Sequence, residues 1–118
     1  MSSQNEKQFA KAITTAFNQG DIDALDRLIA SDCVDHTSLT GQPVGLSGLK
    51  QAWAQLRYTF PETHLVASSV IVDRDRVALQ ANFRAVSSTG KTQEATMVEV
   101  FRLANGKAVD VWNILRWN

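Results

Sequence analysis

The stretch that decides the fold is the second half of the chain, where four segments of alternating apolar and polar residues follow one another. They read THLVASSVIVD (63–73), RVALQANFRAVS (76–87), TQEATMVEVFRLA (92–104) and KAVDVWNILRW (107–117). A period of two is typical of β-strands. The connections are short and rich in turn residues: Asp-Arg-Asp, Ser-Thr-Gly-Lys and Asn-Gly. Because hairpins this short join antiparallel neighbours, the sequence predicts an antiparallel meander.

Upstream of this meander, the apolar residues recur every three to four positions, which is the spacing of an amphipathic helix. The first such segment covers residues 6–21 and ends around Gly20, a residue type that readily follows a last helical turn. Asp21 is a candidate N-cap for a short second helix, and a third covers residues 46–59 before Pro61. Helices followed by antiparallel strands predict an α+β fold, with three N-terminal helices packed on one face of the sheet.

The composition is that of one folded domain. The chain has 118 residues, of which 44% are hydrophobic, and we expect a single domain over residues 1–118. Acidic and basic residues number 12 each, a balance that argues against nucleic acid as a partner. The polar start of the chain and the short apolar runs predict a cytoplasmic protein without membrane contact. Cys33 is the single cysteine, which we expect to be a small buried hydrophobe.

The faces of the later strands carry different residues. In residues 76–86 one face is apolar, whereas the other holds Gln80, Asn82 and Arg84, which suit a cavity lining and a solvated surface equally well. In the last strand neither face is cleanly polar, which indicates that both are covered. Helices on one side and a second copy of the chain on the other would cover them. The sequence therefore favours a homodimer with a cavity between sheet and helices.

Four segments also stand in a characteristic order along the chain. They are NQGDIDALDRLIASDCVDHT (18–37), GLSGLKQAWAQLRYTFPETH (45–64), the Ser-Thr-Gly-Lys hairpin and VFRLANGKAVDVW (100–112). From about Phe9 to its end, the chain resembles the SnoaL-like polyketide cyclases, or ester cyclases, of the NTF2-like superfold. No single motif is decisive, but the ordered set is specific. The resemblance implies a cone of three helices against a strongly curved antiparallel sheet, usually dimeric, with a deep pocket for a small apolar or aromatic molecule.

The resemblance implies a reaction as well. Characterised cyclases of the family close a ring by an intramolecular aldol reaction, with no metal and no organic cofactor. A proton leaves the carbon beside a carbonyl, and the resulting enolate is stabilised inside an apolar pocket. The family's acid/base aspartate lies four residues after a tryptophan, which is Trp112 here, and that position holds Arg116. An arginine stays protonated and is no ordinary general base, so the usual carboxylate is missing.

His36 is then the best remaining proton-transfer group. It lies in DCVDHT (32–37), after the second helix, where related isomerases place a base. An unperturbed imidazole titrates near neutrality. The alternative role for His36 is a structural hydrogen bond to a loop. Arg116 also has two roles open to it. It clamps a carboxylate or enolate if it points into the cavity with Trp112, or it is solvated and paired with an acid such as Glu99.

Aromatic and amide side chains complete the candidate site. The residues expected to bind substrate are Trp53, Phe60, Gln80, Asn82 and Trp112. Asp35 precedes His36, but strand neighbours point to opposite faces, so the two are not assigned as a dyad. His64 is expected at the surface or at the pocket mouth. The two histidines and Asp35 lack the spacing of metal ligands, so no metal site is predicted.

Three functions remain open at this stage. The leading one is a cofactor-free acid–base enzyme for a small apolar carbonyl compound, with His36 as proton carrier and Arg116 or Gln80 orienting the oxygen. The second is a binding module that holds a ligand without turnover, which the missing carboxylate at position 116 supports. The third is a protein-interaction scaffold, which would show a filled cavity and an exposed apolar patch.

Overall fold

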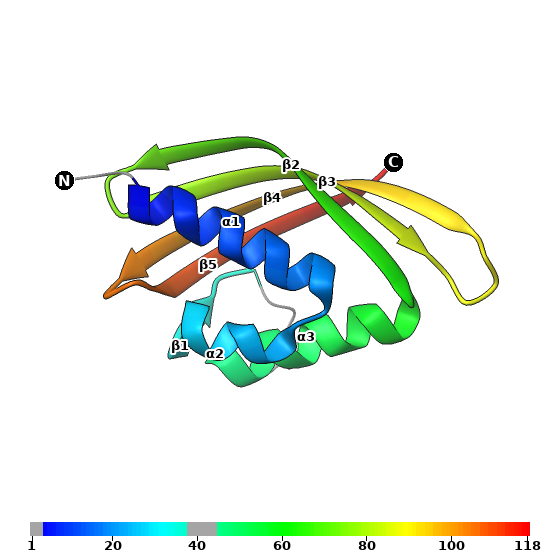
Figure 1. The fold of residues 1–118 in the computed structure, drawn as a ribbon, viewed down its shortest axis with the longest axis horizontal. Helices are drawn as coiled ribbons and strands as arrows, with labels where there is room; N and C mark the ends of the chain where they lie inside the picture. The colour runs from blue at the N-terminus through cyan, green and yellow to red at the C-terminus, as the bar shows by residue number, and fades with distance from the viewer. Residues whose placement is uncertain (1–3, 38–44) are drawn as a thin grey trace.

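The computed structural model describes residues 4–37 and 45–118. The elements are α1 (Gln4–Gln19), the short 3-10 helix η1 (Ile22–Ala24), α2 (Leu25–Leu28), β1 (Ile29–Asp35), α3 (Gly45–Thr59), β2 (Glu62–Asp73), β3 (Arg76–Val86), β4 (Thr92–Ala104) and β5 (Lys107–Trp117). The strands form one open sheet in the order β1-β5-β4-β3-β2. The helices cover one face of this sheet (Figure 1). The predicted α+β fold, with three helices packed on one face of a sheet, is confirmed.

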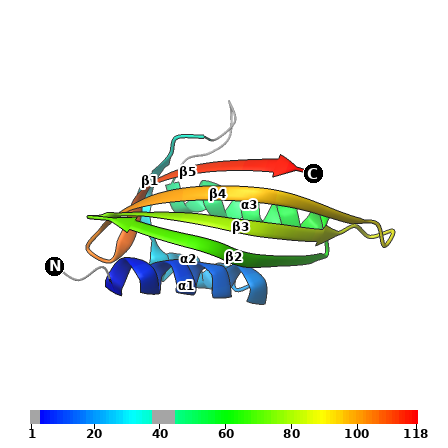
Figure 2. The same cartoon turned by 90° about the horizontal axis from the view of Figure 1, so that it is seen from above.

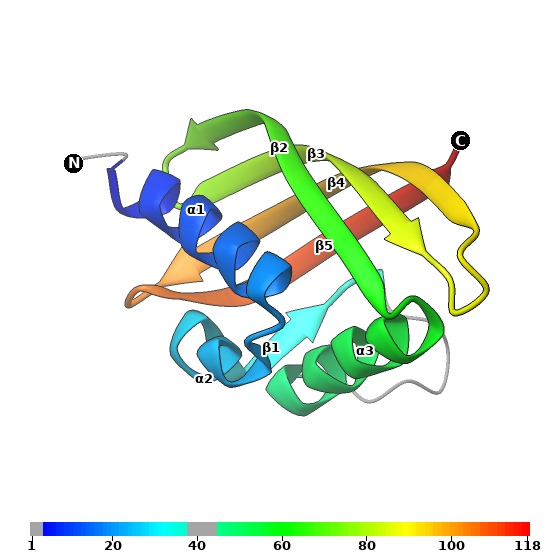
Figure 3. The ribbon, with the colours of Figure 1, turned by 45° about the vertical axis from the view of Figure 1, so that its right-hand side comes forward.

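Strands β2 to β5 form the antiparallel meander that the alternating sequence predicts. The β4–β5 turn has positive φ at both Asn105 (54°) and Gly106 (81°), which is the geometry of a two-residue hairpin turn. Viewed from above, β5 lies at one side of the meander and β2 at the other, next to α1 (Figure 2). β2 has a register shift between Ala67 and Ser69, and the sheet is visibly twisted (Figure 3).

β1 adds a feature that the sequence did not predict. It pairs with β5 at the edge of the sheet, and the two strands run parallel, so the sheet is mixed. Parallel neighbours need a long connection, and here α3 and the first three strands of the meander separate them along the chain. This pairing brings the DCVDHT segment beside the last strand.

The core lies between the helices and the covered face of the sheet. On β3 the apolar parity is fully buried: Val77, Leu79, Ala81, Phe83 and Ala85. Phe17 of α1 packs edge-on against Trp53 of α3 and against Phe83, with ring centroids 5.0 and 5.7 Å apart. Burial of such rings stabilises the fold by about 25 cal/mol per Å² of apolar surface removed from water. Phe17 therefore joins α1, α3 and the sheet.

Two polar contacts fix the end of α1. The side-chain amide of Asn18 donates to the carbonyl of Leu65 at 2.8 Å and accepts from its N–H at 2.7 Å. Arg57 of α3 donates to the carbonyl of Phe17. Gly20, with φ 67°, follows α1 as predicted, and a Cβ at this position would lie 3.2 Å from Arg57 Cζ. These contacts hold α1 against β2 and α3 and so shape the space between them.

Candidate active site

A cavity of about 180 Å³ lies between the sheet and the helices α1 and α3. Its walls are mostly apolar, and Glu99 of β4 and Asn113 of β5 supply the polar side chains. A second cavity of about 90 Å³ shares Glu99 and Asn113, and also has Asp35 in its wall. The two spaces lie next to each other, because they have several lining residues in common, including Trp53.

Glu99 faces this cavity because of its position in the alternation of β4. The side chains on the same side of β4 include Ala95, Met97 and Phe101, which are all buried under the helices. In the neighbouring strand Asn113 is its register partner, and Asn113 Nδ2 donates a hydrogen bond to Glu99 Oε2 at 3.0 Å. The strand pairing thus brings one carboxyl and one amide together in an apolar wall.

The surroundings of Glu99 change its acidity. Its pKa is raised from 4.5 to about 7, mainly by burial and in part by the negative charge of Asp35, while the hydrogen bond from Asn113 opposes the rise. The side chain is half-buried, and the surface that it keeps borders the two cavities. A carboxyl with a pKa near 7 populates both protonation states at neutral pH, so it can donate or accept a proton.

The predicted aromatic residues of α3 and its end lie on this side of the sheet. Trp53 lines both cavities. Phe60 packs against the buried cluster that contains Leu65 and Phe83. Trp53 is therefore in place to contact a bound molecule, and Phe60 supports the wall behind it.

The other predicted pocket residues lie on the opposite face of the sheet. Gln80 and Asn82 alternate with the buried residues of β3 and are exposed. Trp112 and Arg116 share a parity, as expected, but the cavity-facing residues of β5 are Asn113 and Leu115. The parity that points inward thus differs from the one expected. The pattern did not reveal this, because both faces of β5 mix apolar and polar side chains. Roles of these residues in binding or catalysis stay predictions.

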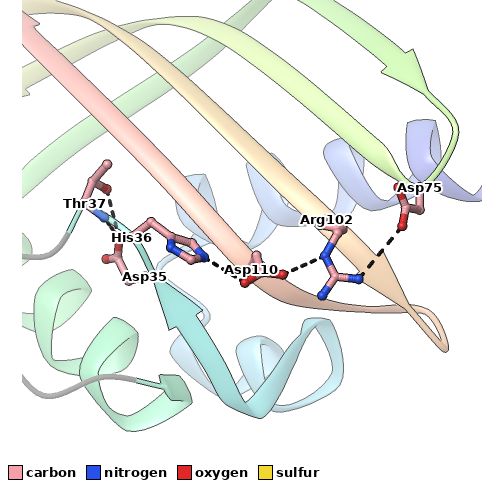
Figure 4. Close-up of polar contacts among 6 residues, drawn as sticks. All are labelled: Asp35, His36, Thr37, Asp75, Arg102 and Asp110. Atoms are coloured by element: carbon pink, nitrogen blue, oxygen red, sulfur yellow. Dashed lines mark hydrogen bonds and ion pairs between the residues drawn. The ribbon is translucent and has the colours of Figure 1, made fainter.

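His36 also lies on the outer face. Its ring stacks on Trp112 with centroids 4.5 Å apart, and its Nε2 lies 2.8 Å from Asp110 Oδ1. Asp110 Oδ2 accepts a hydrogen bond from Arg102 Nε at 2.7 Å, and Arg102 continues to Asp75 at 3.9 Å (Figure 4). The bond from His36 and the contacts with Arg102 lower the pKa of Asp110, against a smaller opposing effect of burial. This arrangement joins the end of β1 to β5, across the sheet from Glu99.

Cys33 and His64 are the two remaining residues that the sequence analysis singled out. Cys33 is buried, as expected, and burial raises the pKa of its thiol to about 11. His64 is exposed on the outer face. Within residues 4–37 and 45–118, no three His, Cys, Asp or Glu side chains gather as metal ligands would. Among the same residues, no helix has the length and apolarity to cross a membrane.

Glu99 and Asn113 are the site residues that the sequence analysis missed. The signal was an acid on an otherwise apolar parity, since Glu99 interrupts the series formed by its neighbours two residues away, Met97 and Phe101. Charged residues are rarely placed on a covered face without a partner or a function. Asn113 interrupts the apolar series of the last strand in the same way, and the hairpin register aligns the two interruptions.

Comparisons with solved structures agree with this fold. A loop-truncated variant of IdmH, a protein assigned as a polyketide cyclase of Streptomyces antibioticus, is 28% identical with a TM-score of 0.81; the match covers 92% of this chain and 91% of the variant. A protein of Bacillus cereus assigned as a polyketide cyclase is 20% identical with a TM-score of 0.88, over 98% of this chain and 78% of its own. AclR of Streptomyces galilaeus, assigned as a hydroxylase, is 22% identical with a TM-score of 0.86, over 98% and 77%.

At such identities, the likeness to the last two proteins shows a common fold. No curated protein matches the chain in sequence. The family model named SnoaL-like polyketide cyclase matches residues 7–115, which is most of the chain. The chain belongs to the SnoaL-like polyketide cyclase family and has its NTF2-like fold.

Proposed function

We propose that this protein is a cofactor-free enzyme that performs acid–base chemistry, of the cyclase or isomerase type, on a small apolar carbonyl compound. The observation that carries the proposal is Glu99, a carboxyl with a pKa raised to about 7 in the wall of an apolar cavity. The resemblance to the cyclases implies that their acid/base aspartate falls at Arg116 in this chain, which lies on the strand parity that faces away from the cavity. In this chain Glu99 takes over the role of the missing carboxylate.

The chemistry follows from the two states of Glu99. The ionised carboxylate removes a proton from the carbon beside a substrate carbonyl, and the Asn113 amide donates a hydrogen bond to the oxygen of the enolate. In a ring closure, the enolate carbon attacks a second carbonyl of the same molecule, and a carbon–carbon bond forms. The second carbonyl oxygen then takes the proton back from Glu99. The apolar walls hold the chain folded for this attack.

The volume of the cavity limits the substrate. About 180 Å³ is close to the volume of a protein cavity that accepts benzene, roughly 150 Å³, and below the roughly 300–1,000 Å³ of pockets for drug-sized ligands. Phe17, Trp53 and Phe83 offer ring edges and faces to such a molecule. The substrate is therefore a single ring, or a chain of the same bulk, with one or two carbonyl groups.

The test is exchange of carbon-bound hydrogen in D₂O, followed by NMR, with single-ring ketones and short diketones as probes. The wild type is expected to accelerate exchange beside the carbonyl, and Glu99→Gln is expected to lose about a hundredfold or more of this rate. Glu94→Gln is the matched control, because Glu94 lies on the same strand and is exposed. Equal rates for wild type and Glu99→Gln would remove Glu99 from the mechanism.

A binding module without turnover is the second candidate. The resemblance implies an aspartate where this chain has Arg116, which favours this function, and the same cavity would hold the ligand. In a thermal-shift assay with the same ketones, this function predicts equal stabilisation of wild type and Glu99→Gln, with no hydrogen exchange in either protein. A scaffold with a filled interior is less consistent with the open cavity.

The proposal includes a homodimer formed through the outer face of the sheet. Exposed apolar side chains lie there side by side, with Val98 of β4 paired to Ile114 of β5. One end of this face carries opposite charges in the pair of Arg102 with Asp110. A second copy related by a two-fold axis can match such a pattern. Light scattering should show a dimer that Val98→Glu converts to a monomer, and a monomeric wild type would refute the dimer.

The cytoplasmic location of the protein stays a prediction.

A further inference from the structure

Hydrogen bonds link the end of β1 to Thr37 and Asn113, and Asn113 is also bonded to Glu99. Asp35 Oδ1 accepts from both the N–H and the hydroxyl of Thr37, each at 2.9 Å (Figure 4). The Thr37 hydroxyl oxygen accepts from the backbone N–H of Asn113, also at 2.9 Å. The Asn113 side chain then donates to Glu99 at 3.0 Å. Asp35 is thereby fixed relative to Glu99 through two intermediate residues.

Asp35 and Glu99 also share a cavity. Both line the smaller space of about 90 Å³. The register of the parallel pair explains this, because Asp35 is aligned with Val111 on β5, a buried residue of the parity that also carries Asn113. The carboxyl of Asp35 therefore belongs to the covered side of the sheet, although it comes from an edge strand.

Apart from Asp35, the described side chains that line the two cavities with Glu99 carry no charge. α1 contributes Ile13 to the two cavities, α3 contributes Trp53 with its apolar neighbours, and β5 contributes the neutral amide of Asn113. Among the described residues that line these cavities, Asp35 is the charged group besides Glu99. A negative charge held near a carboxyl disfavours its ionisation, and the pKa of Glu99 is raised in part by Asp35.

We propose that Asp35 is a positioning residue of the active site, whose fixed negative charge keeps Glu99 ready to hold a proton at neutral pH. The consequence for catalysis rests on the proposed function. When Glu99 is ionised, two carboxylates share one small cavity, so a proton taken from the substrate carbon is bound readily by Glu99. Asp35 itself touches no reacting atom.

The contacts of His36 on the outer face help to position Asp35. His36 follows Asp35 directly, and its contacts with Asp110 and Trp112 hold the end of β1 against β5. Adjacent residues of a strand point to opposite faces, so fixing His36 outside fixes Asp35 inside. His36 then acts on the site through position rather than by carrying a proton.

The experiment is a carbon-13 NMR titration of the glutamate carboxyls, with the Glu99 signal assigned by its absence in Glu99→Gln. In Asp35→Asn the midpoint of the Glu99 titration is expected to fall by about one pH unit. Asp32→Asn is the matched control, since Asp32 is an exposed acid on the same strand, and it should leave the midpoint unchanged. An unchanged midpoint in Asp35→Asn would overturn the proposal.

A second variant covers the case in which Asp35→Asn does not fold. Thr37→Val removes the hydroxyl between Asp35 and Asn113, and it should also lower the Glu99 midpoint because Asp35 is no longer fixed. An unchanged midpoint in this variant counts against the proposal. The titration needs no turnover, so it separates the two proposals. A shifted midpoint without ketone exchange would reject the enzyme and keep the role of Asp35.

Discussion

Two carboxyls on neighbouring strands of this sheet face opposite ways and differ in acidity. Glu99 of β4 points under the helices, where burial raises its pKa to about 7. Asp110 of β5 points outward, where contacts with His36 and Arg102 lower its pKa. The side of the sheet that each side chain faces thus separates an acid that exchanges protons near neutral pH from an acid that stays charged at neutral pH.

The comparison favours the carboxyl that faces the cavity, rather than the cluster with the more familiar catalytic residues, as the candidate acid/base group. His36 and Asp110 form a pair that resembles a catalytic dyad, yet each also holds another group, Trp112 for the ring and Arg102 for the carboxylate. Within residues 4–37 and 45–118, the Glu99 side chain has one hydrogen-bond partner, the amide of Asn113, and a cavity beside it. An incompletely satisfied polar group next to a cavity is the more informative sign of function.

The largest expected effect on stability comes from Glu99→Gln. Unfolded Glu99 titrates near 4.5 and folded Glu99 at about 7. Because the folded state binds this proton more tightly, the stability that it contributes is fully present below pH 4.5 and is lost as the pH rises to about 7. The loss amounts to about 3 kcal/mol. Glu99→Gln should abolish this slope and exceed the wild type in unfolding free energy at about pH 8, as measured by urea unfolding.

The control for this prediction is again Glu94→Gln, which should keep the wild-type slope because Glu94 is exposed on the same strand. If Glu99→Gln and wild type lose stability in parallel between pH 4.5 and 7, then Glu99 titrates like an ordinary surface acid. The contrast between the two faces would then have no basis in acidity.

A smaller effect is expected when the cover of the inner face is loosened. Asn18→Ala removes both hydrogen bonds to Leu65 and leaves that backbone without partners, at a cost of about 2 kcal/mol. The end of α1 moves away from β2, water enters beside Glu99, and its pKa should fall. Chemical denaturation and the carbon-13 titration measure the two effects. Gln19→Ala, at an exposed neighbour, serves as the control, and an equal loss in both variants would contradict the role of the Asn18 contacts.

Most of the fold could be predicted from the sequence because its signals are local. Alternation marks the strands from Glu62 onward, and Asn105 with Gly106 marks the last hairpin. The parallel pairing of β1 could not be predicted, since its partner lies far along the chain and no local pattern specifies such a contact. That pairing places Asp35 in the wall of the smaller cavity and His36 on the opposite face of the sheet.

The candidate site was harder to predict because it depends on which parity faces inward. On β5 both parities hold large apolar residues, so the pattern could place Trp112 and Arg116 on either side. The pattern of β4 is clearer, because the side chains of Met97 and Phe101 face inward. Glu99 lies between them on the same side of the strand and must face inward too. An acid on the apolar parity of a clear strand is therefore a better guide than a histidine in a short motif.

The smallest effect is expected from Asp110→Asn, which weakens the bonds to His36 and Arg102 on the outer face. Because the pKa of Asp110 is lowered in the fold, its contribution is present above its ordinary value of 3.8 and is lost as the pH falls through the lowered value. We expect a loss of about 1 kcal/mol at neutral pH that vanishes in strong acid. Asp75→Asn, which removes the 3.9 Å contact with Arg102, should cost less stability.

A loss in Asp110→Asn that persists unchanged in strong acid would mean that packing, rather than charge, holds β1 in place. With charge confirmed, the two carboxyls would give stability opposite slopes with pH, rising through the acid range of Asp110 and falling through the neutral range of Glu99.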